Sequence, residues 1–294
     1  MPSRTSKFRS WDDYYIPGTT VLQNKLLVNA AQPYGITDPD MLRKAEERAS
    51  LIRMAELARD PLPGLFDYAH MKDIHRTLFQ DVYDWAGQER TGPDRQMTKS
   101  GPDVVNFAPG DPRAPMVNYG YYPAQGIAEA ANAQFRRLAA EDLLRGHGRQ
   151  EFIARLADHW GEINTIHSFR EGNTRTQFVF FSELAAQAGY KLDTAQFAEG
   201  APLRQEFVGA RFYNQATTRT DRLVTVLDKA ISEIGRPGST VANAGYDLDA
   251  LRAATFGHPR RLRSLRRGEA TPTRESEETH NPAALRNRES GYEV

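Results

Sequence analysis

The sequence predicts a mainly α-helical fold, and three of its features support that assignment. Between residues 38 and 234, apolar residues recur at the three- and four-residue spacing of amphipathic helices. Few segments show the alternation of apolar and polar residues that is typical of strands. One stretch, residues 91–125, is broken by closely spaced glycines and prolines, which predicts a long loop in place of a helix.

The helices can be assigned in order from these patterns. The first is expected where Asp-Pro-Asp at 38–40 leads into an apolar stripe that continues to Leu57 and stops before Pro61. A second is expected from Asp67 through Trp85, ending near Gly87. The later helices are expected over residues 127–140, 150–164, 174–188, 203–217 and 220–234.

The glycine- and proline-rich stretch from 91 to 125 contains short extended pieces, such as residues 104–107, which predict a hairpin. Loops of this length are uncommon inside a compact domain unless they serve a function. We therefore interpret the stretch as an element that faces a substrate. The alternative is a poorly ordered insertion.

The composition of the chain changes after residue 235. Five arginines lie between residues 260 and 267, and glutamates then alternate with serine, threonine and proline. This composition predicts a disordered tail. Binding of the arginine cluster to nucleic acid or acidic lipid is the alternative to a solvated, mixed-charge tail.

Composition also excludes several classes of function. Of the 294 residues, 39% are hydrophobic, which is enough for a sizeable core, and 38 basic residues balance 38 acidic ones. A chain with no net charge lacks the basic excess of proteins that wrap nucleic acid, so we expect no direct nucleic-acid binding. The absence of cysteine excludes disulfides, a thiolate nucleophile and a cysteine zinc site.

The chain shows no sign of a membrane or secretory segment. Its N-terminal residues lack an apolar secretory core, and no apolar run approaches the roughly 20 residues that cross a bilayer. We therefore expect a cytoplasmic protein that does not enter a membrane.

Residues 167–175, His-Ser-Phe-Arg-Glu-Gly-Asn-Thr-Arg, join two of the expected helices and concentrate polar groups. His167 follows a helix with an apolar face, so it should be held rigidly. Imidazole has an unperturbed pKa near 6.5, which makes His167 the group in this stretch that could accept a hydroxyl proton near neutral pH. The plainer alternative is a histidine that only packs at a helix end.

The second half of this stretch has the residues of a phosphate site. Gly172 and Asn173 tolerate left-handed conformations, so their amides could form an anion-binding nest at the start of the next helix. Glu171 could hold Mg²⁺ beside the phosphates, and Arg175 could add a bidentate contact. Taken alone, Glu-Gly-Asn is also a common turn.

This stretch resembles the signature of the Fic family, His-x-Phe-x-Asp/Glu-Gly-Asn-Gly-Arg-x-x-Arg. The matching positions are His167, Phe169, Glu171, Gly172, Asn173 and Arg175. Further similarity lies at residues 14–19, 24–25, 74–76 and 78–87, so the resemblance runs from about Tyr14 to Ile234. It implies a Fic-type helical bundle with a short β-hairpin flap. It also implies an N-terminal helical segment at 1–60, a Fic catalytic domain at 61–235 with its flap near 97–108, and a linker and largely disordered charged tail at 236–294.

The resemblance implies a protein adenylyltransferase, which moves AMP from ATP to a Ser, Thr or Tyr hydroxyl of a target protein. His167 would deprotonate that hydroxyl and Glu171 would hold Mg²⁺. The residues implied to bind the phosphates are Gly172, Asn173, Thr174 and Arg175. Those implied to form the flap and position the target are Thr98, Lys99, Ser100 and Phe107.

Two positions depart from the signature. Thr174 replaces its third glycine and Phe178 replaces its last arginine. In family members with both arginines, the second holds the γ-phosphate of ATP. Loss of one charged phosphate contact costs on the order of 1.5 to 3 kcal/mol, so the resemblance implies weakened or repositioned nucleotide binding.

The resemblance also suggests partners. The chain lacks the family's inhibitory Ser/Thr-x-x-x-Glu-Gly/Asn motif. A toxin-like member would then be restrained by a separate, small antitoxin-like protein, and short toxin-type relatives suggest a topoisomerase subunit as the target. Two alternatives stay open: a degenerate Fic domain that only binds a partner, and an enzyme that transfers another phosphoryl or nucleotidyl group.

Overall fold

The computed structural model describes residues 7–93, 96–198 and 200–234, with Asp249, Arg252, Ala253 and the backbone of Thr279–His280. Its fold is mainly α-helical, which confirms the expected class. The α-helices are α1 (Pro39–Arg59), α2 (Tyr68–Phe79), α3 (Ile127–Ala140), α4 (Arg149–Ile166), α5 (Asn173–Gln187), α6 (Pro202–Thr217) and α7 (Asp221–Ala230). Short 3₁₀ turns lie at Asp12–Tyr14, Ala124–Gly126, Asp142–Leu144 and Thr194–Phe197.

Strands form two small sheets. The first contains β1 (Thr98–Pro102), β2 (Met116–Gly120) and the two-residue β5 (Thr279–His280); β2 pairs with β1 antiparallel and with β5 parallel. The antiparallel pair confirms the expected hairpin. The second sheet pairs β3 (Tyr190–Leu192) with β4 (Ile231–Glu233) antiparallel.

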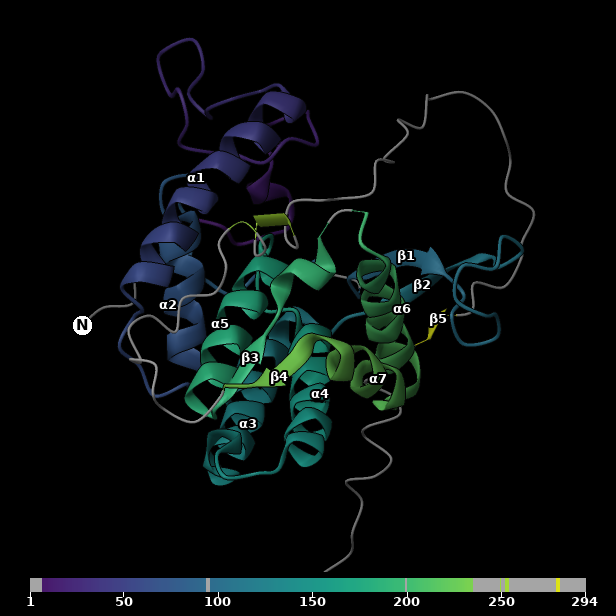
Figure 1. Ribbon diagram of the computed structural model, residues 1–294. Helices are drawn as coiled ribbons and strands as arrows, with labels where there is room; N and C mark the ends of the chain where they lie inside the picture. The colour runs from purple at the N-terminus through teal and green to yellow at the C-terminus, as the bar shows by residue number, and fades with distance from the viewer. Residues whose placement is uncertain are drawn as a thin grey trace, which may run out of the picture.

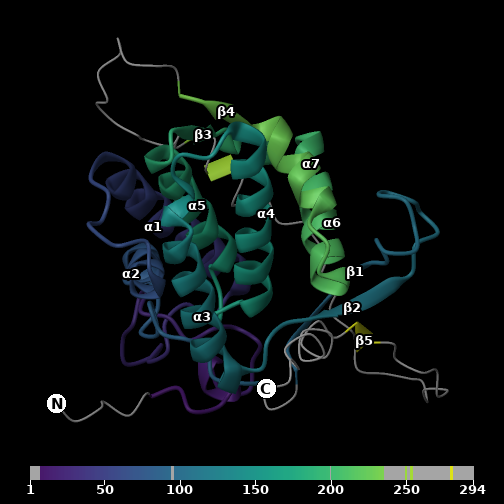
Figure 2. The ribbon, with the colours of Figure 1, turned by 90° about the horizontal axis from the view of Figure 1, so that it is seen from below.

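Helices α4 and α5 lie at the centre of the bundle. Helices α1 and α2 pack together on one side, where α2 contacts α5 (Figure 1). On the other side α6 and α7 pack against α4, as the view from below also shows (Figure 2). The hairpin extends beyond the bundle at the end of α6 (Figure 2). The segment that joins α4 to α5 carries the signature, so the fold places the signature at the end of the two central helices, on the side of the hairpin.

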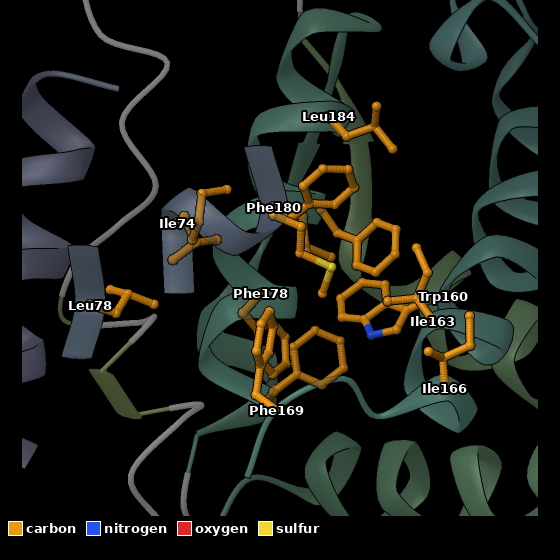
Figure 3. Close-up of a cluster of buried hydrophobic side chains, with 14 of the residues drawn as sticks. Ile74, Leu78, Trp160, Ile163, Ile166, Phe169, Phe178, Phe180 and Leu184 are labelled. Atoms are coloured by element: carbon orange, nitrogen blue, oxygen red, sulfur yellow. The ribbon is translucent and has the colours of Figure 1, made fainter. Parts of the chain in front are cut away.

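Aromatic side chains fill the space between α4 and α5. Figure 3 shows Phe178 and Phe180 of α5 with Trp160 of α4, all fully buried. The same apolar core extends from Phe8 to Ile231 along the sequence, so the N-terminal segment packs into it. Burial of each such side chain contributes about 1.5 to 3 kcal/mol, which gives the signature loop a rigid support.

Three of the expected boundaries are wrong. Helix α2 ends at Phe79 and not near Gly87, because residues 80–87 form turns that fold back until the Gly87 amide donates to His75 Nδ1 at 2.8 Å. Residues 104–107 form a turn and not an extended strand, because the Asp103 carboxylate accepts hydrogen bonds from the amides of Val105 and Asn106.

The third wrong boundary is the end of the last helix, which was expected at 234. Helix α7 stops at Ala230, and Ile231–Glu233 pairs with Tyr190–Leu192 as β4. These two strands lie about forty residues apart in the sequence, so their pairing depends on tertiary packing. The spacing of apolar residues along the chain cannot predict it.

The expectation of a disordered tail over 236–294 falls almost wholly outside the described residues. No helix in the described part of the chain is long and apolar enough to span a membrane.

Candidate functional site

His167 ends helix α4 in the left-handed conformation, with φ 51° and ψ 60°. Its amide still donates to the Ile163 carbonyl, and its ring lies against that of Tyr121, with the ring centroids 4.0 Å apart. The side chain therefore leaves a rigid helix and rests on the residue that follows the hairpin. This placement agrees with the rigid position expected for His167, and its role as a base stays a prediction.

Arg90 fixes the backbone around His167. Its Nε donates to the His167 carbonyl at 2.8 Å, and its own amide donates to the Ser168 carbonyl at 2.8 Å. The other guanidinium nitrogens donate to the carbonyls of Gly92 and Tyr122, on either side of the hairpin. Arg90 is 2% exposed, so this one side chain ties the signature loop to both ends of the flap.

Asn173 closes the loop between α4 and α5 with its side chain. Its Oδ1 accepts from the Phe169 amide at 3.0 Å, and its Nδ2 donates to the Phe169 carbonyl at 2.7 Å. The Asn173 side chain therefore shapes the loop, and only its backbone amide is left for a phosphate.

His75 of α2 supports the same loop from below. Its ring stacks on Phe169 with centroids 3.8 Å apart, and Nε2 lies 3.0 Å from the Glu171 carbonyl. Because Nδ1 accepts from Gly87, we assign the proton to Nε2, which donates to Glu171. Burial lowers the pKa of His75 to about 3, so this histidine is neutral and structural.

Gly172 precedes α5 with φ 80°, and a Cβ at this position would lie 2.3 Å from the Phe79 ring. Both the backbone angle and the close approach require glycine. No side chain caps α5 at its N-terminus, whereas Asp38 and Asp67 cap α1 and α2. The first amides of α5 and the positive end of its dipole therefore stay available to an anion.

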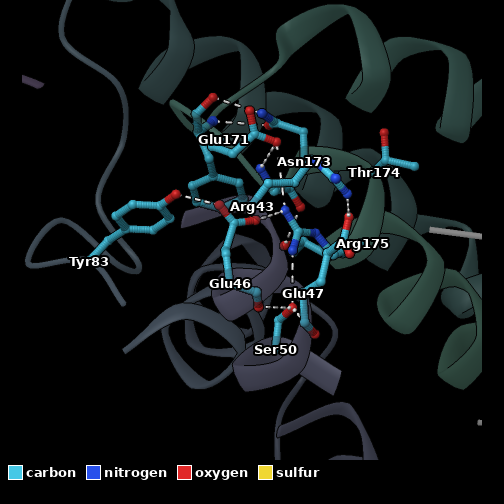
Figure 4. Close-up of polar contacts among 12 residues, drawn as sticks. Arg43, Glu46, Glu47, Ser50, Tyr83, Glu171, Asn173, Thr174 and Arg175 are labelled. Carbon is cyan, nitrogen blue, oxygen red and sulfur yellow. Dashed lines mark hydrogen bonds and ion pairs between the residues drawn. The ribbon is translucent and has the colours of Figure 1, made fainter. Parts of the chain in front are cut away.

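Arg175 is turned toward α1. Its NH2 pairs with Glu46 and its NH1 donates to Ser50 Oγ at 3.0 Å (Figure 4). Glu46 also accepts a hydrogen bond from the Tyr83 hydroxyl. Glu171 lies farther from this guanidinium, at 3.7 Å. The buried Arg175 thus serves as a bridge between α5 and α1, and its phosphate-binding role stays a prediction.

Glu171 suits a magnesium ion. Its carboxylate is 39% exposed, and Oε1 accepts from the Gly172 amide at 3.0 Å. The described residues contain no cluster of three or more metal-ligating side chains. A single carboxylate fits Mg²⁺, which commonly takes one or two protein carboxylates and completes its shell with water and nucleotide phosphates.

Positive charge surrounds His167. Burial lowers the pKa of His167 well below 6.5, and the charges of Arg90, Lys99 and Arg211 lower it further. The imidazole is therefore neutral at pH 7 and able to accept a proton. An anion bound among these cations would oppose their effect and raise the pKa of His167.

The expected flap residues separate into two groups. Thr98, Lys99 and Ser100 lie on β1, and all three are exposed. Strand β1 has β2 as its only sheet neighbour in the described chain, so its other edge is open to a further strand. Phe107 lies beyond the strand in the connecting loop and is half-buried.

The hairpin is anchored on α6. Tyr119 of β2 stacks on Phe212 with centroids 4.4 Å apart, and Gly101 of β1 approaches the same ring so closely that a Cβ would lie 2.6 Å from it. Gln215 Nε2 also donates to the Gly120 carbonyl at 2.7 Å. The flap therefore has a fixed base beside the signature loop.

Several contributors to the site were not identified from the sequence: Arg90, His75 as a loop support, Glu46 and Arg211. Each lies at least 37 residues from the signature position that it contacts. No local pattern marks such residues. The only signal was the similarity around residues 74–87, which did not assign His75 a role.

Comparisons with known proteins identify the family of this site. A family model described as Fic/DOC family matches residues 65–185. A probable protein adenylyltransferase of Sinorhizobium fredii is 36% identical over 187 residues, 63% of this chain and 81% of that protein. The probable protein adenylyltransferase Fic of Escherichia coli is 33% identical over 182 residues, 62% of this chain and 76% of that protein.

Another relative, protein adenylyltransferase VbhT of Bartonella schoenbuchensis, is 35% identical over 182 residues. The match covers 62% of this chain but only 32% of that protein. Among solved structures, BepC of Bartonella tribocorum with bound AMPPNP superposes with a TM-score of 0.59 at 22% identity, over 76% of this chain and 97% of that one. An N-terminal Fic domain of Bartonella quintana with bound ADP also gives 0.59, at 23% identity, over 75% and 95%. These superpositions agree on the fold.

Proposed function

The chain belongs to the Fic/DOC family, and from this membership we propose that it transfers AMP from ATP to a hydroxyl group of a target protein. Relatives named protein adenylyltransferases support this activity. The observation that carries the proposal is the position of His167, which Arg90 holds at the end of α4, one short loop before the uncapped start of α5.

The chemistry follows from these groups. The target hydroxyl gives its proton to His167 as its oxygen attacks the α-phosphorus of ATP. A new bond forms between that oxygen and phosphorus, the bond from the α-phosphorus to the bridging oxygen breaks, and pyrophosphate leaves. The amides of Asn173 and Thr174 hold phosphate oxygens at the N-terminus of α5, while the Gly172 amide donates to the Glu171 carboxylate.

Glu171 would hold Mg²⁺, which when bound offsets phosphate charge. The carboxylate is already oriented by the Gly172 amide, and Arg175 is mostly engaged by Glu46. Glu171 would present its exposed face to the ion, and we propose that Arg175 chiefly bridges α5 to α1.

The open edge of β1 would receive the target. An extended target segment could pair with the backbone of Thr98, Lys99 and Ser100, which would bring its hydroxyl toward His167. Phe107 would contact the same segment from the connecting loop. Main-chain pairing gives little preference among side chains, so we propose Ser, Thr or Tyr as acceptors.

Finer parts of the proposal rest on the resemblance to short family members. They are a toxin-like role, restraint by a small antitoxin-like protein and a topoisomerase subunit as target. The absence of cysteine supports a cytoplasmic location. We also propose a catalytic domain over 61–235, an N-terminal helical segment at 1–60 and a linker with tail at 236–294.

Self-modification tests the function. The purified chain is incubated with α-labelled ATP and Mg²⁺, beside His167→Ala and Glu171→Ala. His147→Ala serves as a matched control, because His147 precedes the N-terminus of α4, whereas His167 follows its C-terminus. The helix has 18 residues and is about 27 Å long, so His147 is far from the site. We expect label on the wild type and on the control. We expect a loss of about 100-fold or more in His167→Ala.

Each other result points to a different reaction. Retained labelling in folded His167→Ala would refute His167 as the base. Label from another nucleoside triphosphate would change the donor, and label from γ-labelled ATP alone would indicate phosphate transfer. No label from any donor would favour a domain that only binds its partner.

A further inference from the structure

The two departures from the signature face the same neighbour, helix α6. Phe178 is 1% exposed, and its ring packs on Trp160 and on Phe207 of α6, with centroids 5.4 and 5.7 Å away. Thr174 lies one helical turn earlier on α5, with its hydroxyl 3.5 Å from NH1 of Arg211 on α6. An arginine at 178 has thus been replaced by a core residue, while an arginine from α6 reaches the preceding turn of α5.

Arg211 lies between these two positions. Its guanidinium lies over the ring of Phe207, one turn earlier on α6, with 4.9 Å from Cζ to the centroid. Phe207 in turn contacts Phe178. The guanidinium of Arg211 therefore lies next to the aromatic cluster that includes Phe178, and its NH1 faces Thr174 and Asn164.

The charge of Arg211 is not neutralised by the described chain. Arg211 forms no ion pair with a carboxylate of a described residue, and its Nε is buried without a hydrogen-bond partner. Its contacts are two long hydrogen bonds to neutral oxygens, at 3.3 Å to Asn164 and 3.5 Å to Thr174. Burial lowers its pKa, as expected for a cation without a counter-ion.

This charge acts on the site. Burial and then the charge of Arg211 lower the pKa of Lys99, and Arg211 is also among the charges that, after burial, lower the pKa of His167. Helix α6 also anchors the flap through Phe212 and Gln215, which fixes Arg211 relative to β1. A guanidinium that is rigidly placed, poorly paired and next to the start of α5 suits a phosphate, because charge-assisted bonds to phosphate are stronger than those it now makes.

We propose that Arg211 binds the polyphosphate of the nucleotide and supplies from α6 the charge that the family signature places at position 178. This assignment rests on the proposed function, because it concerns the same nucleotide. Thr174 and Phe178 are then linked changes that accommodate an arginine from another helix. The weaker nucleotide binding expected from the loss of the second signature arginine is then offset by Arg211.

Nucleotide affinity tests this assignment. Binding of ATP, ADP and AMP in the presence of Mg²⁺ is measured by calorimetry for the wild type and Arg211→Gln. We expect ATP affinity to fall about 10- to 100-fold. AMP affinity should change less than about threefold, because its single phosphate is held at α5. Arg219→Gln is the matched control, since Arg219 is 65% exposed and pairs with Asp221, and its affinities should equal those of the wild type.

The outcomes separate the two proposals. Equal ATP affinities in wild type and Arg211→Gln, with transfer intact and dependent on His167, would overturn the role of Arg211 and leave the function standing. An equal loss for ATP and AMP would also overturn it. A folded wild type that binds no nucleotide would overturn the proposed function itself. If Arg211→Gln does not fold, Arg211→Lys is measured in its place. We expect a several-fold loss of affinity for ATP alone, because lysine keeps the positive charge but lacks the planar guanidinium that binds phosphate with two nitrogens.

Discussion

The ion pair between Glu46 and Arg175 should stabilise the fold strongly. The two side chains are 12% and 7% exposed, and Arg175 bridges α5 to α1. Removing one partner of a buried pair costs about 3 to 5 kcal/mol, because the other charge is left in a poorly solvated place. Glu171 remains 3.7 Å from Arg175 and offers partial compensation. We therefore expect Glu46→Gln to lower the free energy of unfolding by about 3 kcal/mol, the lower end of that range.

Urea unfolding at pH 7 measures this effect. Glu47→Gln is the control, because this neighbour on α1 pairs with Arg43, whose side chain is 53% exposed, and we expect a change within about 0.5 kcal/mol. The double variant Glu46→Leu with Arg175→Met removes both charges, so it should lose much less than the sum of the single losses. Additive losses, or a loss below about 1 kcal/mol in Glu46→Gln, would refute the reasoning.

Two further predictions concern the support of the signature loop. Gly172→Ala should lower the free energy of unfolding by about 2 to 4 kcal/mol, from left-handed strain plus the clash with Phe79. Gly146→Ala, with φ 75° and no atom within 4 Å, should cost only the strain, and equal losses in thermal unfolding would contradict the clash. Because the pKa of His75 falls from 6.5 to about 3 on folding, the unfolded chain alone binds its proton within that window. Stability should therefore fall as pH drops below 6.5, and His75→Gln should reduce that slope by up to about 1.4 kcal/mol per pH unit in urea titrations; an unchanged slope would contradict the assignment.

Local sequence determined much of the fold. The start of α1 after Asp38 follows from a capping residue, and the start of α3 at Ile127 follows from apolar spacing; both signals act within a few residues. The predicted helix ends were wrong where residues that are distant in the sequence determine where the helix stops. The end of α2 depends on the bond from Gly87 to His75, and the end of α7 depends on pairing with Tyr190–Leu192.

The sequence by itself also predicted the chemical character of the site, because His167, Glu171 and Gly172 lie close together in the chain and their proposed roles as base, metal ligand and nest need no tertiary contact to be predicted. Only the tertiary structure decided how these groups are held and charged. Arg90, Glu46 and Arg211 come from separate elements, and packing alone brings their charges to the loop. Electrostatic interactions depend on distance in space and on burial, and neither quantity is encoded by spacing along the chain.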